Sequence, residues 1–166
     1  MGAVVLALGF VSAPADSASP VKLAVFDFEL EEASAVGSFP EQTADKATTA
    51  AALEKASSEA RHELAQSGRY TLVDVSRVDA QPVRAKLLRN CNGCEAGIAR
   101  DLGAEQSLLG VVMKASQTYY YVVIQIRDAR TGKLLDQQGA NFAGTEAGWA
   151  SGVRMLIKHQ VLAGQD

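Results

Sequence analysis

A chain of 166 residues is long enough for one domain with a buried core and too short for two comfortable ones. Hydrophobic residues make up 48% of the chain and charged residues 21%, a balance that excludes global disorder. The net charge is −3 and the basic residues are scattered without a basic run, so nucleic acid is disfavoured as a partner.

The first fifteen residues carry no charge and have features of a secretory leader. Ala3 to Val11 is an apolar run of signal-peptide length that is too short to span a bilayer, and Ala13-Pro14-Ala15 forms an A-x-A cleavage pattern. No Lys or Arg precedes the run, so this leader is incomplete or weak; the competing interpretation is an apolar first strand or helix. We expect residues 1–20 to be a signal peptide or leader, residues 21–166 to form a single domain, and the protein to be exported to the periplasm.

The first half of the domain has the pattern of a strand, a helix and a second strand. Val21 to Phe28 is apolar on both faces, as a central strand would be, and the polar stretch from Glu29 to Gln42 is predicted to be a loop. Small and apolar residues at helical spacing predict a helix over 43–67 that ends at Gly68, and 69–75 is a second strand. A helix between two strands predicts a parallel pair with a right-handed crossover.

The second half adds a connection, two helices and three strands. We predict a connecting region at 76–90, a short helix at 95–102, a strand at 106–114, a hairpin of strands 119–127 and 134–142 around the turn Asp128 to Lys133, and a last helix at 149–162. The predicted fold class is α/β (α+β): a single mixed sheet of about five strands with flanking helices, in the order β-α-β-α-β-β-β-α.

Asn90-Cys91-Asn92-Gly93-Cys94 is the most distinctive chemical feature. In an oxidising compartment, the two thiols would form a short-loop disulfide that pins the loop to the following helix. A second interpretation is redox chemistry, because a helix N-terminus lowers a thiol pKa. A third is metal binding, for which two thiolates are half a zinc site, and His62 and His159 are distant in sequence. All three interpretations remain open, and no metal ion or other cofactor is expected.

Two further groups are candidate binding residues. Strand alternation places Tyr119, Tyr121 and Arg127 on one face of the hairpin, where they would either pack against a covering helix or contact a protein partner. Glu29, Glu31 and Glu32 follow the first strand, at the end of an α/β sheet where ligands often bind. This acidic group would bind a cation or a basic partner, or would form a solvated loop.

Several segments together resemble a known fold. Lys22 to Phe28, Gly68 to Asp74, Gly103 to Glu105 with the apolar strand after it, and the turn Asp128 to Lys133 resemble the amino-terminal domain of TolB and the related periplasmic domain of curli-secretion proteins. The resemblance covers most of residues 21–162. It implies a mixed sheet with flanking helices that serves envelope proteins in protein–protein contacts rather than in catalysis.

A second resemblance is more particular. Cys91 to Cys94, Ala99 to Ala104 and Trp149 to Arg154 resemble a family of uncharacterised bacterial exported proteins, a domain of unknown function, over nearly the whole mature chain. This resemblance implies a link to periplasmic quinoprotein alcohol oxidation, near whose genes some members lie, without a mechanism at the level of residues.

The leading hypothesis is a non-catalytic periplasmic binding or assembly module that contacts a periplasmic or envelope protein through a sheet edge or an exposed sheet face. A Gly-rich phosphate loop, an H-E-x-x-H motif and a G-x-S-x-G motif are all missing from the sequence, and two histidines without a paired nucleophile disfavour a hydrolase. Two alternatives are a thiol–disulfide redox protein using Cys91 and Cys94, and a protein that binds a small ligand or a metal ion. No membrane span is expected.

Overall fold

The first strand and the first long helix form the parallel unit that the sequence predicts. In the computed structural model, which describes residues 19–32, 46–76, 87–116 and 118–163, β1 (Val21–Val25) pairs in parallel with β3 (Tyr70–Val73). α1 (Lys46–Gln66) lies between them in the chain and ends where Gly68 adopts a φ of +71°, a conformation that favours glycine. Mostly small side chains line its buried stripe, so α1 can lie close to the sheet: Ala52, Ala56, Ser57, Ala60, Glu63 and Leu64.

One extra residue interrupts the strand predicted at 21–28. β1 and β2 (Glu29–Glu32) both pair in parallel with β4 (Gln106–Ser116), but the step of four from Val25 to Glu29 faces a step of only three from Leu108 to Val111. This is a β-bulge, which leaves one residue unpaired and reverses the facing of all later side chains. The prediction of a loop from Glu29 to Gln42 is therefore wrong for β2, while residues 33–42 lie outside the described residues.

Side chains of α1 satisfy the backbone at this bulge. Ser57 Oγ accepts a hydrogen bond from the Phe28 backbone N–H at 2.8 Å, and Arg61 Nη2 donates to the Val25 carbonyl at 3.1 Å. Arg61 also pairs with Asp27 at 2.7 Å. Ser57 is buried, so its hydroxyl serves a backbone group that would otherwise lack a partner.

The hairpin is confirmed, with strands slightly longer than predicted. β4 pairs antiparallel with β5 (Tyr119–Asp128), which pairs antiparallel with β6 (Leu134–Ala143). The six-stranded sheet has the order β3-β1-β4-β5-β6, with β2 paired to β4 beside this path. Strand alternation buries one set of β5 side chains under the helices, as predicted: Tyr120, Val122, Ile124 and Ile126.

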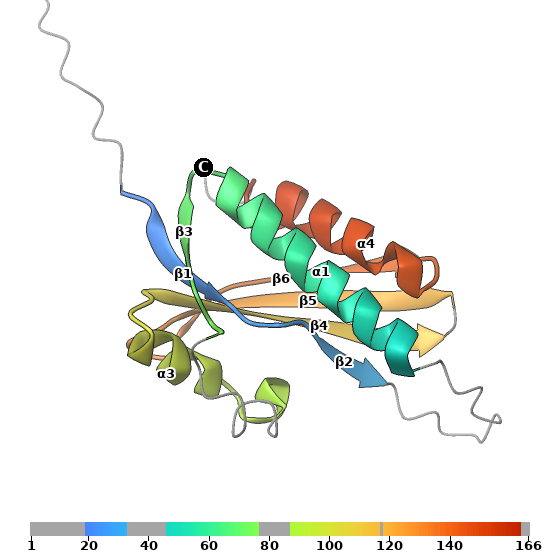
Figure 1. Ribbon diagram of the computed structural model, residues 1–166, viewed down its shortest axis with the longest axis horizontal. Helices are drawn as coiled ribbons and strands as arrows, with labels where there is room; N and C mark the ends of the chain where they lie inside the picture. The colour runs from blue at the N-terminus through green and yellow to red at the C-terminus, as the bar shows by residue number, and fades with distance from the viewer. Residues whose placement is uncertain (1–18, 33–45, 77–86, 117, 164–166) are drawn as a thin grey trace, which may run out of the picture.

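Helices cover both faces of the sheet, but unequally (Figure 1). On one face lie α1 and α4 (Trp149–Leu156), and α4 continues through a wider helical turn, η3 (Ile157–Val161). They bury the larger core, which includes Trp149 and Leu23. On the opposite face, η1 (Leu88–Asn90) and α3 (Cys94–Asp101) cover a smaller core, which contains Phe26, Leu88 and Ala99.

The predicted fold class, a mixed sheet with flanking helices, is confirmed, with six strands instead of about five. Among the described residues, no helix combines the length and the apolar character needed to cross a membrane. Residues 1–18 of the predicted leader lie outside the described part of the chain.

Candidate functional site

The loop between η1 and α3 brings the two cysteines together. Asn92 and Gly93 have φ angles of +46° and +106°, so the chain turns tightly and α3 begins at Cys94, one residue before the predicted start. The Cys91 and Cys94 sulfur atoms are bonded, and their Cα atoms lie 5.6 Å apart, within the usual disulfide range. Cys94 is thus the first residue of α3, whereas Cys91 stands three residues earlier and is exposed.

A buried ion pair lies next to this loop. Glu95, the residue after Cys94, is only 1% exposed, and its Oε1 lies 3.1 Å from Arg127 Nε without an aligned hydrogen bond. Arg127 reaches the pair from β5, and its guanidinium also donates to the Gly132 carbonyl at 3.2 Å and to Asn92 Oδ1 at 3.5 Å. Arg127 therefore joins the hairpin turn to the cysteine loop, and its side chain is largely buried at 13% exposure.

The sequence prediction did not include Glu95. An acidic residue in the first turn of a helix usually interacts with the helix dipole at the surface, which is the obvious role from sequence. A signal was available, because Glu95 lies four residues before Ala99, on the face of α3 that packs against the sheet. His62 and His159 are both exposed, and the group of possible metal-ligating side chains found in the described residues contains Cys91, Cys94 and Glu95 but neither histidine.

The three predicted acidic residues lie in β2. Strand alternation sends Glu29 and Glu31 to the face of α3 and η1. Glu29 is 13% exposed and accepts hydrogen bonds from the backbone N–H groups of Leu88 and Arg89, at 2.6 and 3.2 Å. Its carboxylate thus holds η1 in place, whereas Glu31 is exposed.

The three consecutive tyrosines have three different environments. Tyr119 is 46% exposed, and Tyr121 is half-buried, with its ring over Gly139 of β6, where an added Cβ would overlap the tyrosine hydroxyl. Tyr120 points into the larger core and donates its hydroxyl to the Gly148 carbonyl at 2.9 Å. Burial raises the pKa of Tyr120 above its usual value of 10.0. Tyr119 and Tyr121 therefore share the face opposite α1 and α4, as predicted from alternation.

β6 forms an edge of the sheet. Among the described residues, it pairs only with β5, and its ten residues contain one charge, Asp136, and no proline or lysine. Leu134 and Leu135 are exposed at its beginning. β3, at the other end of the strand order, has four residues, and β2 also pairs with a single strand, β4, among the described residues.

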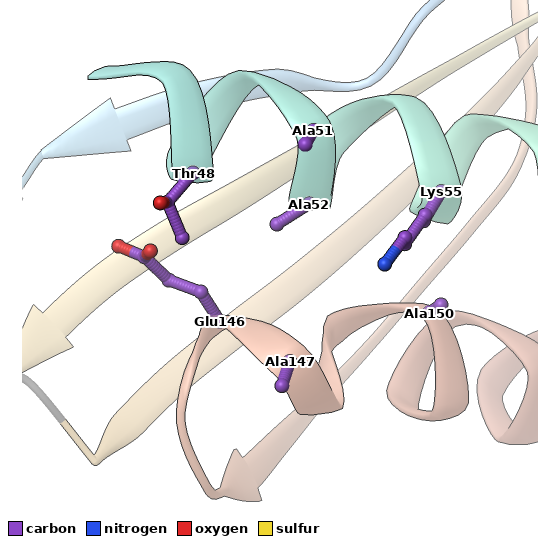
Figure 2. Close-up of a pocket in the computed structure, with 7 residues that line it drawn as sticks. All are labelled: Thr48, Ala51, Ala52, Lys55, Glu146, Ala147 and Ala150. Atoms are coloured by element: carbon purple, nitrogen blue, oxygen red, sulfur yellow. The ribbon is translucent and has the colours of Figure 1, made fainter. Parts of the chain in front are cut away.

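A hollow of about 250 Å³ lies between α1 and the segment from η2 (Glu146–Gly148) to α4. Figure 2 shows small side chains of the two helical segments facing each other, with Lys55 towards one end and Glu146 towards the other. Glu146 is already engaged, because its Oε1 lies 2.7 Å from Lys114 Nζ and accepts a hydrogen bond from Thr49 Oγ1 at 3.2 Å.

Comparisons with known proteins find solved structures of similar fold and one matching family. The carboxy-terminal domains of LpoB from Salmonella enterica and from Escherichia coli each have a TM-score of 0.52 and 19% identity, covering 78% of this chain and 87% of theirs. TolB from Acinetobacter baumannii has a TM-score of 0.42 and 15% identity, covering 87% of this chain and 29% of TolB. The two LpoB domains share the fold of this chain, and no curated protein matches it. The DUF3280 family model, described as a protein of unknown function (DUF2380), matches residues 21–161, so the chain belongs to this family, in agreement with the resemblance predicted from its sequence.

Proposed function

We propose that this domain is a non-catalytic periplasmic interaction module that binds an extended segment of an envelope protein along β6. The observation that supports this proposal is the edge of β6, which after the register shift at Leu135 pairs only with β5 among the described residues. A row of unpaired backbone groups on an edge strand is a template for another strand, and proteins normally protect such edges with lysine, proline or a covering element. The ten residues of β6 contain neither lysine nor proline.

The side chains of β6 suit an added strand. Gln137, Gly139 and Asn141 alternate along the face opposite α1 and α4, and they are uncharged and small or flexible. Leu135, at 47% exposure, offers an apolar contact at the beginning of the strand. Main-chain hydrogen bonds would supply affinity, and a partner segment with an apolar residue opposite Leu135 would be preferred.

Two further arguments support the periplasmic location and the class of partner. A cysteine pair at bonding distance is typical of oxidising compartments. The resemblance of the sequence to the TolB amino-terminal and curli-secretion domains implies protein–protein contacts in the envelope. The finer prediction, a partner in periplasmic quinoprotein alcohol oxidation, is tested by the identity of the protein that β6 contacts.

Site-specific photocrosslinking in cells that produce the full chain tests the proposal. A photoreactive residue at Gln137 should give one discrete adduct with an envelope protein, and the same residue at Ser151, exposed on α4, should not. Leu135→Lys should abolish the adduct, because lysine protects an edge strand. Met155→Lys is the matched control: Met155 is 50% exposed on α4, and its replacement should leave the adduct intact.

Three outcomes contradict the proposal: equal adducts from Gln137 and Ser151, an adduct that survives Leu135→Lys, or an adduct of the chain with itself. The alternative of ligand or metal-ion binding at the acidic segment remains a prediction. Glu29 is already engaged with η1, and an increase in melting temperature on addition of divalent cations would support such a site.

A further inference from the structure

One oxygen atom of the buried Glu95 carboxylate lacks a partner. Oε1 faces Arg127, but Oε2 is inaccessible to solvent and has no hydrogen-bond partner among the described residues. A buried acceptor without a donor costs about 1–3 kcal/mol, and most native proteins avoid this cost. The position of Glu95 therefore needs an explanation beyond packing.

The reactive groups beside the Glu95 carboxylate are the two cysteines. One carboxylate oxygen of Glu95 and the sulfur atoms of Cys91 and Cys94 all lie within 4.8 Å of one another. A disulfide has no proton to donate, but a thiol does. Opening the bridge would therefore create a donor beside the carboxylate.

We propose that Glu95 accepts the thiol proton of Cys94 when the opened Cys91–Cys94 bridge closes by thiol exchange, so that the bridge is a reactive disulfide rather than an inert one. The co-reactant is a dithiol reductant, either a small molecule or a partner protein. The proposal does not depend on the proposed function, because it concerns the cysteine loop and a different reaction.

The exchange can be written as a balanced reaction. A thiolate of the reductant attacks the exposed Cys91 sulfur, the Cys91–Cys94 bond breaks, and its electron pair leaves on Cys94, which takes the proton that the attacking thiol released to water. The second thiol of the reductant then displaces Cys91, so that two electrons pass from the dithiol to the bridge. In the reverse direction, Cys94 transfers its proton to Glu95, and the resulting thiolate attacks the Cys91 sulfur. The bound group leaves as a thiolate, which takes up the proton that Glu95 then releases to water.

The position of each cysteine fits its role in this reaction. Cys91 is exposed and therefore open to attack by an external thiolate. Cys94 begins α3, where the backbone N–H groups of the first turn stabilise a thiolate. The charged group that faces Glu95 is Arg127 of β5, and the neighbouring β4 residue paired with Arg127 is the uncharged Ser107.

Removal of Glu95 should change the rate of ring closure in opposite directions for its two possible roles. If Glu95 acted only as a negative charge, its removal would favour the Cys94 thiolate and accelerate the attack on Cys91. If Glu95 accepts the proton, its removal slows that attack. The Arg127 guanidinium compensates much of the Glu95 charge, so we expect the loss of the proton acceptor to dominate.

The test measures ring closure in the reduced full chain. After reaction with oxidised glutathione, acid quenching and mass spectrometry follow how fast the mixed disulfide at Cys91 converts to the bridge. Glu95→Gln should slow this step at least about tenfold, since general base catalysis contributes about 10²–10⁴-fold. Asp101→Asn, which removes an exposed carboxylate from the same helix, should leave the rate unchanged, and both rates should become equal in concentrated guanidinium.

An unchanged or faster closure in Glu95→Gln would overturn the proposal. A second measurement needs no variant and covers the case in which Glu95→Gln does not fold. The reduced-minus-oxidised infrared spectrum of the wild-type protein should contain a shifted carboxylate band, because a thiol then donates to Glu95. A difference spectrum without a carboxylate band would also overturn the proposal.

Discussion

Replacing both cysteines of the bridge by serine tests how much the bridge contributes to stability. The bridge closes a very short loop, because Cys91 and Cys94 are separated by three positions. In the chain-entropy model, a loop of about four residues stabilises the folded state by about 2 kcal/mol, less than the ~3 kcal/mol of a fifteen-residue loop. For a domain of this size, a loss of about 2 kcal/mol lowers the melting temperature by roughly 4–8 °C.

Thermal unfolding of the wild type and of Cys91→Ser/Cys94→Ser, with and without dithiothreitol, measures this loss. The reductant should lower the melting temperature of the wild type to that of the variant and leave the variant unchanged. A loss well above about 4 kcal/mol would refute the reasoning, because it exceeds what so short a loop can supply and would mean that the bridge holds α3 against the sheet. No loss at all would refute it as well.

Two further predictions concern the larger core. Gly110→Ala should destabilise the fold by about 1–3 kcal/mol in denaturant unfolding, because the new Cβ would overlap the Phe28 ring; Gly97→Ala in α3, with open space around its Cβ, should not destabilise it. Tyr120→Phe should lose about 1 kcal/mol at pH 7 with its hydrogen bond. Burial raises the pKa of Tyr120 above 10.0, so this tyrosine ionises first in the unfolded chain. The stability of the wild type should therefore fall as the pH rises above about 10, and that of Tyr120→Phe should fall less steeply. Equal slopes of stability against pH in the two proteins would contradict this assignment.

Local patterns were sufficient to predict most of the fold. In β5, the apolar residues Val122, Ile124 and Ile126 recur at every second position, and the structure buries the row that this alternation selects. The helix between β1 and β3 correctly predicted their parallel pairing. In both cases, the information lies within one element or in the order of adjacent elements.

β2 could not be predicted because its local signals favour a loop. Three of its four residues are glutamates, which have low strand propensity, and Leu30 packs against the larger core. What makes Glu29–Glu32 a strand is pairing with β4, more than seventy positions later in the chain. The predicted sheet of about five strands therefore lacked β2, and the structure has six strands.

The candidate site, too, was predictable from the sequence only where its residues are neighbours in the chain. Cys91 and Cys94 are neighbours in sequence, so their spacing alone indicated that they could meet. The Glu95–Arg127 pair joins residues 32 positions apart in two different elements, and neither residue has a local feature that identifies its partner. Likewise, Glu29 was correctly placed after the first strand, but its hydrogen bonds to η1 depend on a segment about sixty residues away.

The bulge between β1 and β2 changes how mutations in this strand should be interpreted. Before the bulge, odd-numbered residues such as Leu23 and Val25 lie under α1; after it, even-numbered residues such as Phe28 and Leu30 do. Without the bulge, the step of four from Val25 would turn Glu29 and Glu31 towards the helices, whereas deletion of one residue within 26–28 would leave them on their present face. The bulge thus lets one stretch of chain be apolar on both sides at its start and acidic at its end without burying Glu29 beneath α1.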